Sequence, residues 1–238
     1  MKVLLMPISF MPMYRNEGNT FGYVVEVDPL NASASLVKRV AMGRLAHEAA
    51  VCSLPQAGQP LAFYMGCDSM NEYIYKFVSD ARWDPKDIAG GISAGDKYLN
   101  EGKLYAAQFN DDGQGAWIEL SIDNPKIKQY SAYRFANQAD IFVNTRIAAD
   151  AVGATRMDRP EWGAVNPKNG EVYVTLTNSN AKMRNVSTVD AANPRAYQDT
   201  DGLKATGNPN GHIIRFKEAS SQSDAKTFAW DIFLFGAE

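Results

Sequence analysis

Two stretches of the sequence repeat one order of strands and turns, and this repetition limits the possible folds more than any other feature. In residues 155–178, charged residues precede a short apolar strand, and the turn NPKNG follows at 166–170. Proline fixes φ and Asn-Gly tolerates positive φ, so this turn suits a hairpin. Val172, Val174 and Leu176 then alternate with polar residues, which is the period of a half-buried strand. The stretch therefore predicts a hairpin whose first strand begins beside charged side chains.

The same order occurs earlier in the chain. Residues 47–51 precede a turn that contains Pro55, Gly58 and Pro60, and an apolar strand follows at 61–66. Each unit continues with a third and a fourth strand, at 72–77 and 104–109 in the first unit and at 211–216 and 228–234 in the second. Radial repetition of four-stranded sheets is the architecture of a β-propeller. We therefore predict an all-β fold, a partial β-propeller of four-stranded blades.

Three other segments interrupt or extend this repeat. Residues 131–152 contain many helix formers at helical spacing, which predicts a helical insertion that ends at Gly153. Residues 80–100 and 179–210 are polar and lack periodicity, so both are expected to be loops. Residues 22–40 resemble part of a further unit.

Composition excludes several classes of protein. The 238 residues are 45% hydrophobic and 21% charged, with a net charge of −3, as in a globular protein with one core. No run of five like charges occurs, which argues against a nucleic-acid-binding surface or a polybasic membrane contact. The apolar start, Met1 to Met13, is broken by two prolines, is too short to span a membrane and makes a poor signal peptide. Cys52 and Cys67 either pair in an oxidising compartment or remain two free thiols.

The candidate site residues come from equivalent places in the two units. Glu48 and Glu161 both precede the first strand of a unit, and in a propeller both carboxylates would point at one site on the axis. Hard cations prefer several carboxylate and carbonyl oxygens, so this site would suit a metal. Arg159 offers a planar fork of donors that matches phosphate or carboxylate. The alternative is that Arg159 and Glu48 simply pair across the channel.

Structural roles are expected for the neighbouring polar residues, although three of them remain candidate site residues. His47 should face the opposite side of its strand from Glu48, and Asp158 should orient the loop before Arg159. Asn166 should serve the turn through its side chain.

The remaining residues near the two hairpins are expected to have no role in binding or catalysis. Asp68 and Glu72 are expected to be solvated turn carboxylates, and Trp162 to lie in the core. The sequence contains no P-loop, nucleophile elbow, CxxC or dinucleotide-binding fingerprint, so nucleophilic serine or cysteine catalysis has no support.

Four segments resemble the PhoX-type alkaline phosphatases: GRLAHEAAV, YIYKFVSD, NTRIAADAVGATRMDRPEWGAVNPKNGEVYVTLTN and NPNGHIIRFKE. The resemblance extends from about Phe21 to the C-terminus. It implies a six-bladed β-propeller with Fe³⁺ and Ca²⁺ on its axis, which hydrolyses phosphomonoesters in the periplasm or outside the cell. It also implies that Glu48 and Glu161 are metal ligands and that Arg159 binds the substrate phosphate.

The sequence departs from the family pattern at both ends. The family's cysteine-bearing early segment does not match residues 1–20, its later blades should follow Phe235, and no twin-arginine export signal is visible. We therefore expect an unmatched segment 1–20 and an incomplete propeller 21–238, a fragment of a phosphatase. The alternatives are a non-catalytic phosphate- or anion-binding propeller, or a structural remnant that oligomerises through open sheet edges.

Overall fold

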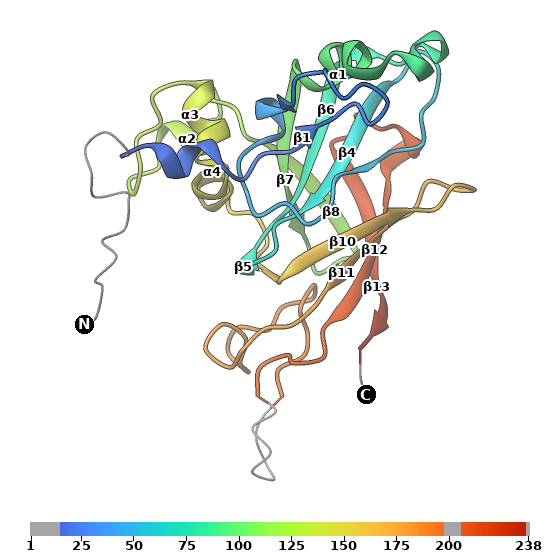
Figure 1. Cartoon of the computed structure of the whole chain (residues 1–238). Helices are drawn as coiled ribbons and strands as arrows, with labels where there is room; N and C mark the ends of the chain where they lie inside the picture. Colours follow the sequence, from blue (N-terminus) through green and yellow to red (C-terminus); the bar gives the residue numbers. More distant parts are fainter. Residues whose placement is uncertain (1–14, 198–205, 237–238) are drawn as a thin grey trace, which may run out of the picture.

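The computed structural model describes residues 15–197 and 206–236 and is dominated by β-strands (Figure 1). The strands are β1 Val25–Glu26, β2 Val37–Lys38, β3 Val51–Cys52, β4 Pro60–Gly66, β5 Met70–Glu72, β6 Ile74–Arg82, β7 Gly102–Phe109, β8 Gln114–Glu119, β9 Met157–Asp158, β10 Pro160–Val165, β11 Val172–Leu176, β12 His212–Glu218 and β13 Thr227–Phe235. The α-helices are α1 Gly91–Leu99, α2 Pro125–Lys128, α3 Gln138–Val143 and α4 Thr145–Val152. The apolar start, Met1 to Met13, lies outside the described residues.

One nine-stranded antiparallel sheet contains both predicted units. Its order is β10-β11-β12-β13-β8-β7-β6-β4-β3, so each unit is a meander of four neighbouring strands, as the sequence predicted. Strand β8 pairs with β7 on one side and with β13 on the other, and it joins the two meanders by their last strands. The units are therefore parts of one sheet here, and the six-bladed propeller stays a prediction.

The sheet nearly closes on itself because its two end regions meet. Strand β10 lies against β3 and β4. A Cβ atom on Gly66 of β4 would lie 2.4 Å from the carbonyl oxygen of Glu161, so only glycine allows this approach. The edges that were expected to be open therefore face each other.

Aromatic side chains fill the space between the two meanders. Tyr64, Trp117, Phe216 and Phe228 form a cluster with ring centroids 4.9–6.1 Å apart. Alternate residues of β11 and β12 are buried there, which explains the period of two in their sequences.

Helices cover the other face of the first meander (Figure 1). Ile141 of α3 and Ala148 and Val152 of α4 belong to the same buried cluster as Tyr75 and Phe77 of β6. The first six residues of β6 are buried, because this strand packs on both faces, and it reads as a nearly continuous apolar run.

The helical insertion is shorter and more broken than predicted. Residues 131–137 are not helical, and Asn144 separates α3 from α4 with φ −113° and ψ 41°. The predicted end is confirmed, since Gly153 caps α4 in the left-handed conformation with φ 74°.

Two further segments differ from expectation. Residues 80–100 are not simply a loop: a 3₁₀ turn and α1 lie there, and the side chain of Asp84 caps the turn by accepting from the backbone N–H of Lys86. Residues 22–40 form only the two-stranded ribbon β1–β2. In the part of the chain that the structure describes, the search for an apolar helix of membrane-spanning length finds none.

Candidate functional site

Arg159 lies between β9 and β10 in a backbone conformation that is rare for its residue type. Its φ is +59°, and its N–H donates to the carbonyl of Met157 at 2.9 Å. A non-glycine residue held in this region costs about 1–3 kcal/mol and persists only where neighbouring structure imposes it. Strand β9 pairs with β5, where Met70 faces Asp158. This pairing brings the turn that precedes β5, which contains Asp68, beside Arg159.

The side chain of Arg159 is held by a carboxylate that was interpreted as a solvated turn residue. Its Nε donates to Asp68 Oδ1 at 2.6 Å, and its Nη2 donates to Asp68 Oδ2 at 3.4 Å. Nη2 also lies 3.5 Å from Glu161 Oε1. The interpretation of Asp68 was wrong, because the β5–β9 pairing that brings it to Arg159 leaves no local trace in the sequence. Glu72 likewise pairs with Arg146.

Glu48 and Glu161 approach the same stretch of β4 from two directions. The N–H of Glu48 donates to the carbonyl of Gly66 at 3.4 Å, while the backbone of Glu161 contacts Gly66 from β10. Glu48 is exposed, and the side chain of Glu161 is 25% exposed. The hydrogen bond with Asp68, and then the charges of Asp68, Glu161 and Glu48, raise the pKa of Arg159. We call Arg159, Asp68, Glu161 and Glu48 the Arg159 cluster.

The Arg159 cluster is not by itself a metal centre. Among residues 15–197 and 206–236, no three His, Cys, Asp or Glu side chains converge as metal ligands would. The roles predicted for Glu48, Glu161 and Arg159 stay predictions at this point.

Three other sequence-based expectations concern single side chains. His47 Nε2 donates to the carbonyl of Gly43 at 3.0 Å, and burial lowers the pKa of this histidine. Asn166 serves the turn as expected, since its Oδ1 accepts from the N–H of Lys168 at 2.9 Å. Trp162 was expected in the core, but it is 61% exposed.

Asp158 is fully buried, and its carboxylate is already occupied. Oδ1 accepts from Arg184 Nε at 2.8 Å, and Oδ2 accepts from Asn208 Nδ2 at 2.8 Å. Both partners come from the long segment predicted as a loop. Asp158 therefore connects that segment to the residue beside it, Arg159.

The two cysteines are free thiols in the structure. Burial raises the pKa of Cys52 to about 11 and that of Cys67 to about 12. Both thiols are therefore protonated near neutral pH and are poor nucleophiles.

A second ionic group lies inside the sheet and was missed by sequence reasoning. Glu218 Oε1 accepts from Lys76 Nζ at 2.8 Å, from Tyr64 Oη at 3.0 Å and from Trp117 Nε1 at 3.0 Å. We call these four residues the Glu218 network. Its only trace in the sequence is Lys76, a charged residue among the apolar residues that begin β6.

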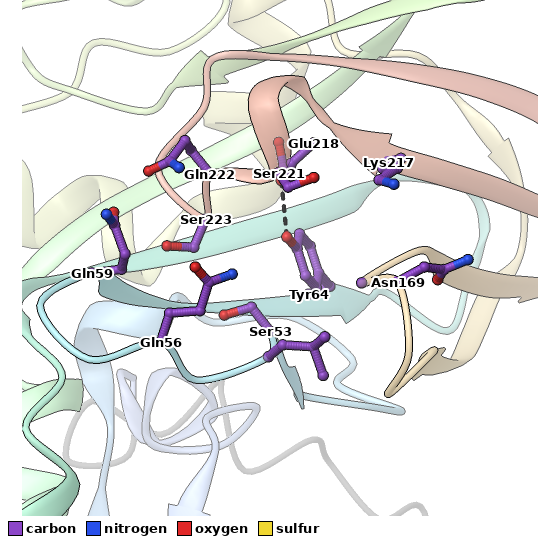
Figure 2. Close-up of a pocket in the computed structure, with 12 residues that line it drawn as sticks. Ser53, Gln56, Gln59, Tyr64, Asn169, Lys217, Glu218, Ser221, Gln222 and Ser223 are labelled. Atoms are coloured by element: carbon purple, nitrogen blue, oxygen red, sulfur yellow. Dashed lines mark hydrogen bonds between the residues drawn. The ribbon is translucent and has the colours of Figure 1, made fainter.

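A polar pocket of about 60 Å³ adjoins the Glu218 network. Figure 2 shows Tyr64 pointing toward Glu218, with Gln56, Gln59 and Ser223 among the other residues that line the pocket. The pocket lies at the Pro60 end of β4, whereas the Arg159 cluster lies at the Gly66 end. Since Lys76 Nζ also donates to the carbonyls of Ser223 and Ala225, the network retains no free charge for a ligand.

Comparison with known proteins gives one family. The sequence profile of the PhoX alkaline phosphatase family matches residues 8–238, and so begins before the boundary near Phe21 that the sequence suggested. The structure of Pseudomonas fluorescens PhoX in complex with vanadate, a transition-state analogue, aligns with a TM-score of 0.78 and 38% identity over 92% of this chain. This chain covers 36% of that protein. Glucosyltransferase-S of Streptococcus mutans serotype c is 26% identical over 180 residues, which are 68% of this chain and 12% of that protein.

Proposed function

Because the chain belongs to the PhoX alkaline phosphatase family, we propose that Arg159 binds the phosphate group of a phosphomonoester in a metal-dependent hydrolase. The observation that carries this proposal is the arrangement of the guanidinium, which Asp68 holds along one edge. Nη1, on the other edge, makes no hydrogen bond with any residue that the structure describes. A guanidinium fixed in this way presents a planar pair of donors that suits two phosphate oxygens.

The charge of the Arg159 cluster supports the metal dependence. One guanidinium faces the carboxylates of Asp68, Glu161 and Glu48. A phosphomonoester carries about −1.5 to −2 charges near pH 7, so these carboxylates would repel it without added cations. In the part of the chain that is described, neither Glu48 nor Glu161 accepts a side-chain hydrogen bond, and both can serve as cation ligands. Bound cations would neutralise this charge and polarise the phosphoryl group.

The finer features of the proposal follow from the family. They are Ca²⁺ and Fe³⁺ as the ions, a six-bladed propeller as the complete fold, and a periplasmic or extracellular location. Calcium takes six to eight oxygen ligands, and Glu48 and Glu161 supply only part of such a set. The rest would come from the remainder of a PhoX-type protein, of which this chain covers 36% in the related structure.

Hydrolysis of p-nitrophenyl phosphate by a PhoX-type protein that contains residues 1–238, supplied with Ca²⁺ and Fe³⁺, tests the proposal. We expect Arg159→Met to lower kcat/KM by about 10²–10³-fold, because a charge-stabilising donor is removed. Metal content by elemental analysis should stay unchanged in this variant. Glu161→Gln should instead lower both metal content and turnover.

Arg215→Met is the matched control, because Arg215 forms an ion pair with Asp231 on β12 and β13. It should leave kcat/KM unchanged. Wild-type kcat/KM in Arg159→Met would rule out the proposed role of Arg159. Phosphate binding without turnover in the wild-type protein would favour the anion-binding alternative.

A further inference from the structure

We propose that the segment after β11 fixes the phosphate-binding arginine through a buried clamp, which consists of Asp158, Arg184, Asn193 and Asn208. This inference rests on the proposed function of Arg159. Arg184, Asn193 and Asn208 are assigned as positioning residues that act through Asp158 and do not touch the substrate.

The clamp first holds the carboxylate of Asp158. Arg184 Nε and Asn208 Nδ2 each donate to one of its oxygens at 2.8 Å. Asp158 and Asn208 are fully buried, and Arg184 is 2% exposed. The guanidinium Nε and the amide are both engaged with Asp158 in the interior, so we assign them no contact with the substrate.

The clamp also holds the backbone that leads into Arg159. Asn193 Oδ1 accepts from the N–H of Asp158 at 3.1 Å, and Asn193 Nδ2 donates to the carbonyl of Arg156 at 3.0 Å. Arg184 Nη2 donates to the same carbonyl at 3.3 Å. The side chain and the backbone N–H of Asp158 are thus both fixed from the same segment.

This attachment matters because the next residue has an unfavourable backbone conformation. Arg159 has φ +59°, and a residue with a side chain keeps that value only where the residues around it leave no alternative. On the C-terminal side of its Cα atom, the carbonyl of Arg159 accepts from the N–H of Thr177 at 3.1 Å. If the clamp were loosened, Arg159 could relax to negative φ, and its side chain would turn away from Asp68.

Among its described residues, 177–197 and 206–211, the segment that carries the clamp forms no helix or strand, and its turns are organised around Arg184. Asn180 Oδ1 accepts from the N–H groups of Lys182 and Met183, and the side chain of Arg184 also contacts the carbonyl of Thr188. Burial of Arg184 therefore couples the order of this segment to the geometry of the arginine site.

A double-mutant cycle in the same PhoX-type protein tests the proposal, with the competitive inhibition constant of inorganic phosphate as the readout. We expect Arg184→Met to raise this constant and the KM for p-nitrophenyl phosphate by about 10–100-fold, as small misplacements of a binding group do. In an Arg159→Met background, Arg184→Met should have no further effect on the inhibition constant, because it acts through Arg159. Arg184→Lys should restore part of the loss.

Asn208→Ser is the second variant, for use if Arg184→Met does not fold. It removes one hydrogen bond to Asp158 and leaves the Arg184 ion pair in place, and it should raise the inhibition constant in the same direction. Equal effects of Arg184→Met with and without Arg159 would overturn the clamp proposal, as would a lowered melting temperature with unchanged KM and inhibition constant. An unchanged inhibition constant in Arg159→Met alone would instead overturn the proposed function.

Discussion

The Arg159 cluster and the Glu218 network both bring a cation to carboxylates, but the two groups are built in opposite ways. The side chain of Arg159 is 33% exposed and faces a surplus of negative charge from a strained backbone position. The side chain of Lys76 is fully buried and donates to one carboxylate and two carbonyls. Unbalanced charge at the surface can still bind a ligand, whereas the paired charges in the interior are already satisfied by the protein itself.

Removing Lys76 should give the largest change in stability. Lys76→Met leaves the buried carboxylate of Glu218 without its counter-charge, although Tyr64 and Trp117 still donate to it. We expect the free energy of unfolding to fall by about 3–5 kcal/mol, the usual cost of breaking a buried pair from one side. Urea denaturation followed by tryptophan fluorescence measures this loss, and Lys76→Met/Glu218→Gln should recover part of it. A loss of unfolding free energy as small as that of a surface ion pair would contradict the assignment of Lys76 and Glu218 as a buried ion pair.

Closure of the sheet can be tested at Gly66. A Cβ atom at this position would meet the carbonyl oxygen of Glu161 at 2.4 Å, so Gly66→Ala forces β10 away from β4. We expect a loss of about 1–3 kcal/mol in unfolding free energy, as for other overpacked sites. The displaced Glu161 should also weaken phosphate inhibition. Gly163→Ala is the matched control, because its Cβ would meet no atom closer than the Val51 side chain at 3.2 Å and the carbonyl oxygen of Tyr173 at 3.4 Å. Equal effects of the two variants would argue against closure at Gly66.

His212, which lies beside the clamp residue Asn208, should make the free energy of unfolding fall at acidic pH. Its Nε2 contacts the carbonyl of Ala192 at 2.7 Å, and burial lowers its pKa below the ordinary 6.5. The unfolded chain therefore takes up a proton first, and stability falls as pH drops below about 6.5, by at most about 1.4 kcal/mol per pH unit. Melting curves from pH 7.5 to 5 should be less pH-dependent in His212→Gln. If the melting temperature of His212→Gln depended on pH as steeply as that of the wild type, His212 would be excluded as the titrating group.

The exposed pair between Arg215 and Asp231 should give the smallest effect. Both side chains are partly solvated, and such pairs contribute about 0–1 kcal/mol. Arg215→Met should therefore change the unfolding free energy far less than Lys76→Met in the same urea titration. A loss of several kcal/mol would show that exposure does not separate the two kinds of ion pair in this protein.

Local sequence patterns predicted the local structure well. The alternation in residues 172–176, the turn at 166–170 and the helix end at Gly153 are all present. Trp162 was assigned to the wrong side of its strand because the β10–β11 register shifts between Pro160 and Gly163. Such an irregularity reverses the alternation and leaves no mark in the residue types.

Pairs that join distant parts of the chain could not be predicted in the same way. Asp68 and Arg159 are separated by 91 positions, and Lys76 and Glu218 by 142. Their proximity depends on which strands become neighbours, and hydrophobic periodicity does not encode that choice. The repeat compares two units instead of reading one, and the site it predicts for Glu48 and Glu161 stays a prediction.

The near closure of the sheet also sets the order in which the protein can acquire its binding site. Each meander is built from strands close in sequence, whereas the contact of β10 with β4 joins segments about a hundred residues apart. Non-local contacts form slowly, because the entropy of closing a long loop is lost before the contact stabilises the chain. Asp68 and Arg159 meet only when the two meanders dock. During refolding, we therefore expect far-ultraviolet circular dichroism, which reports strand formation within each meander, to recover before phosphate binding does.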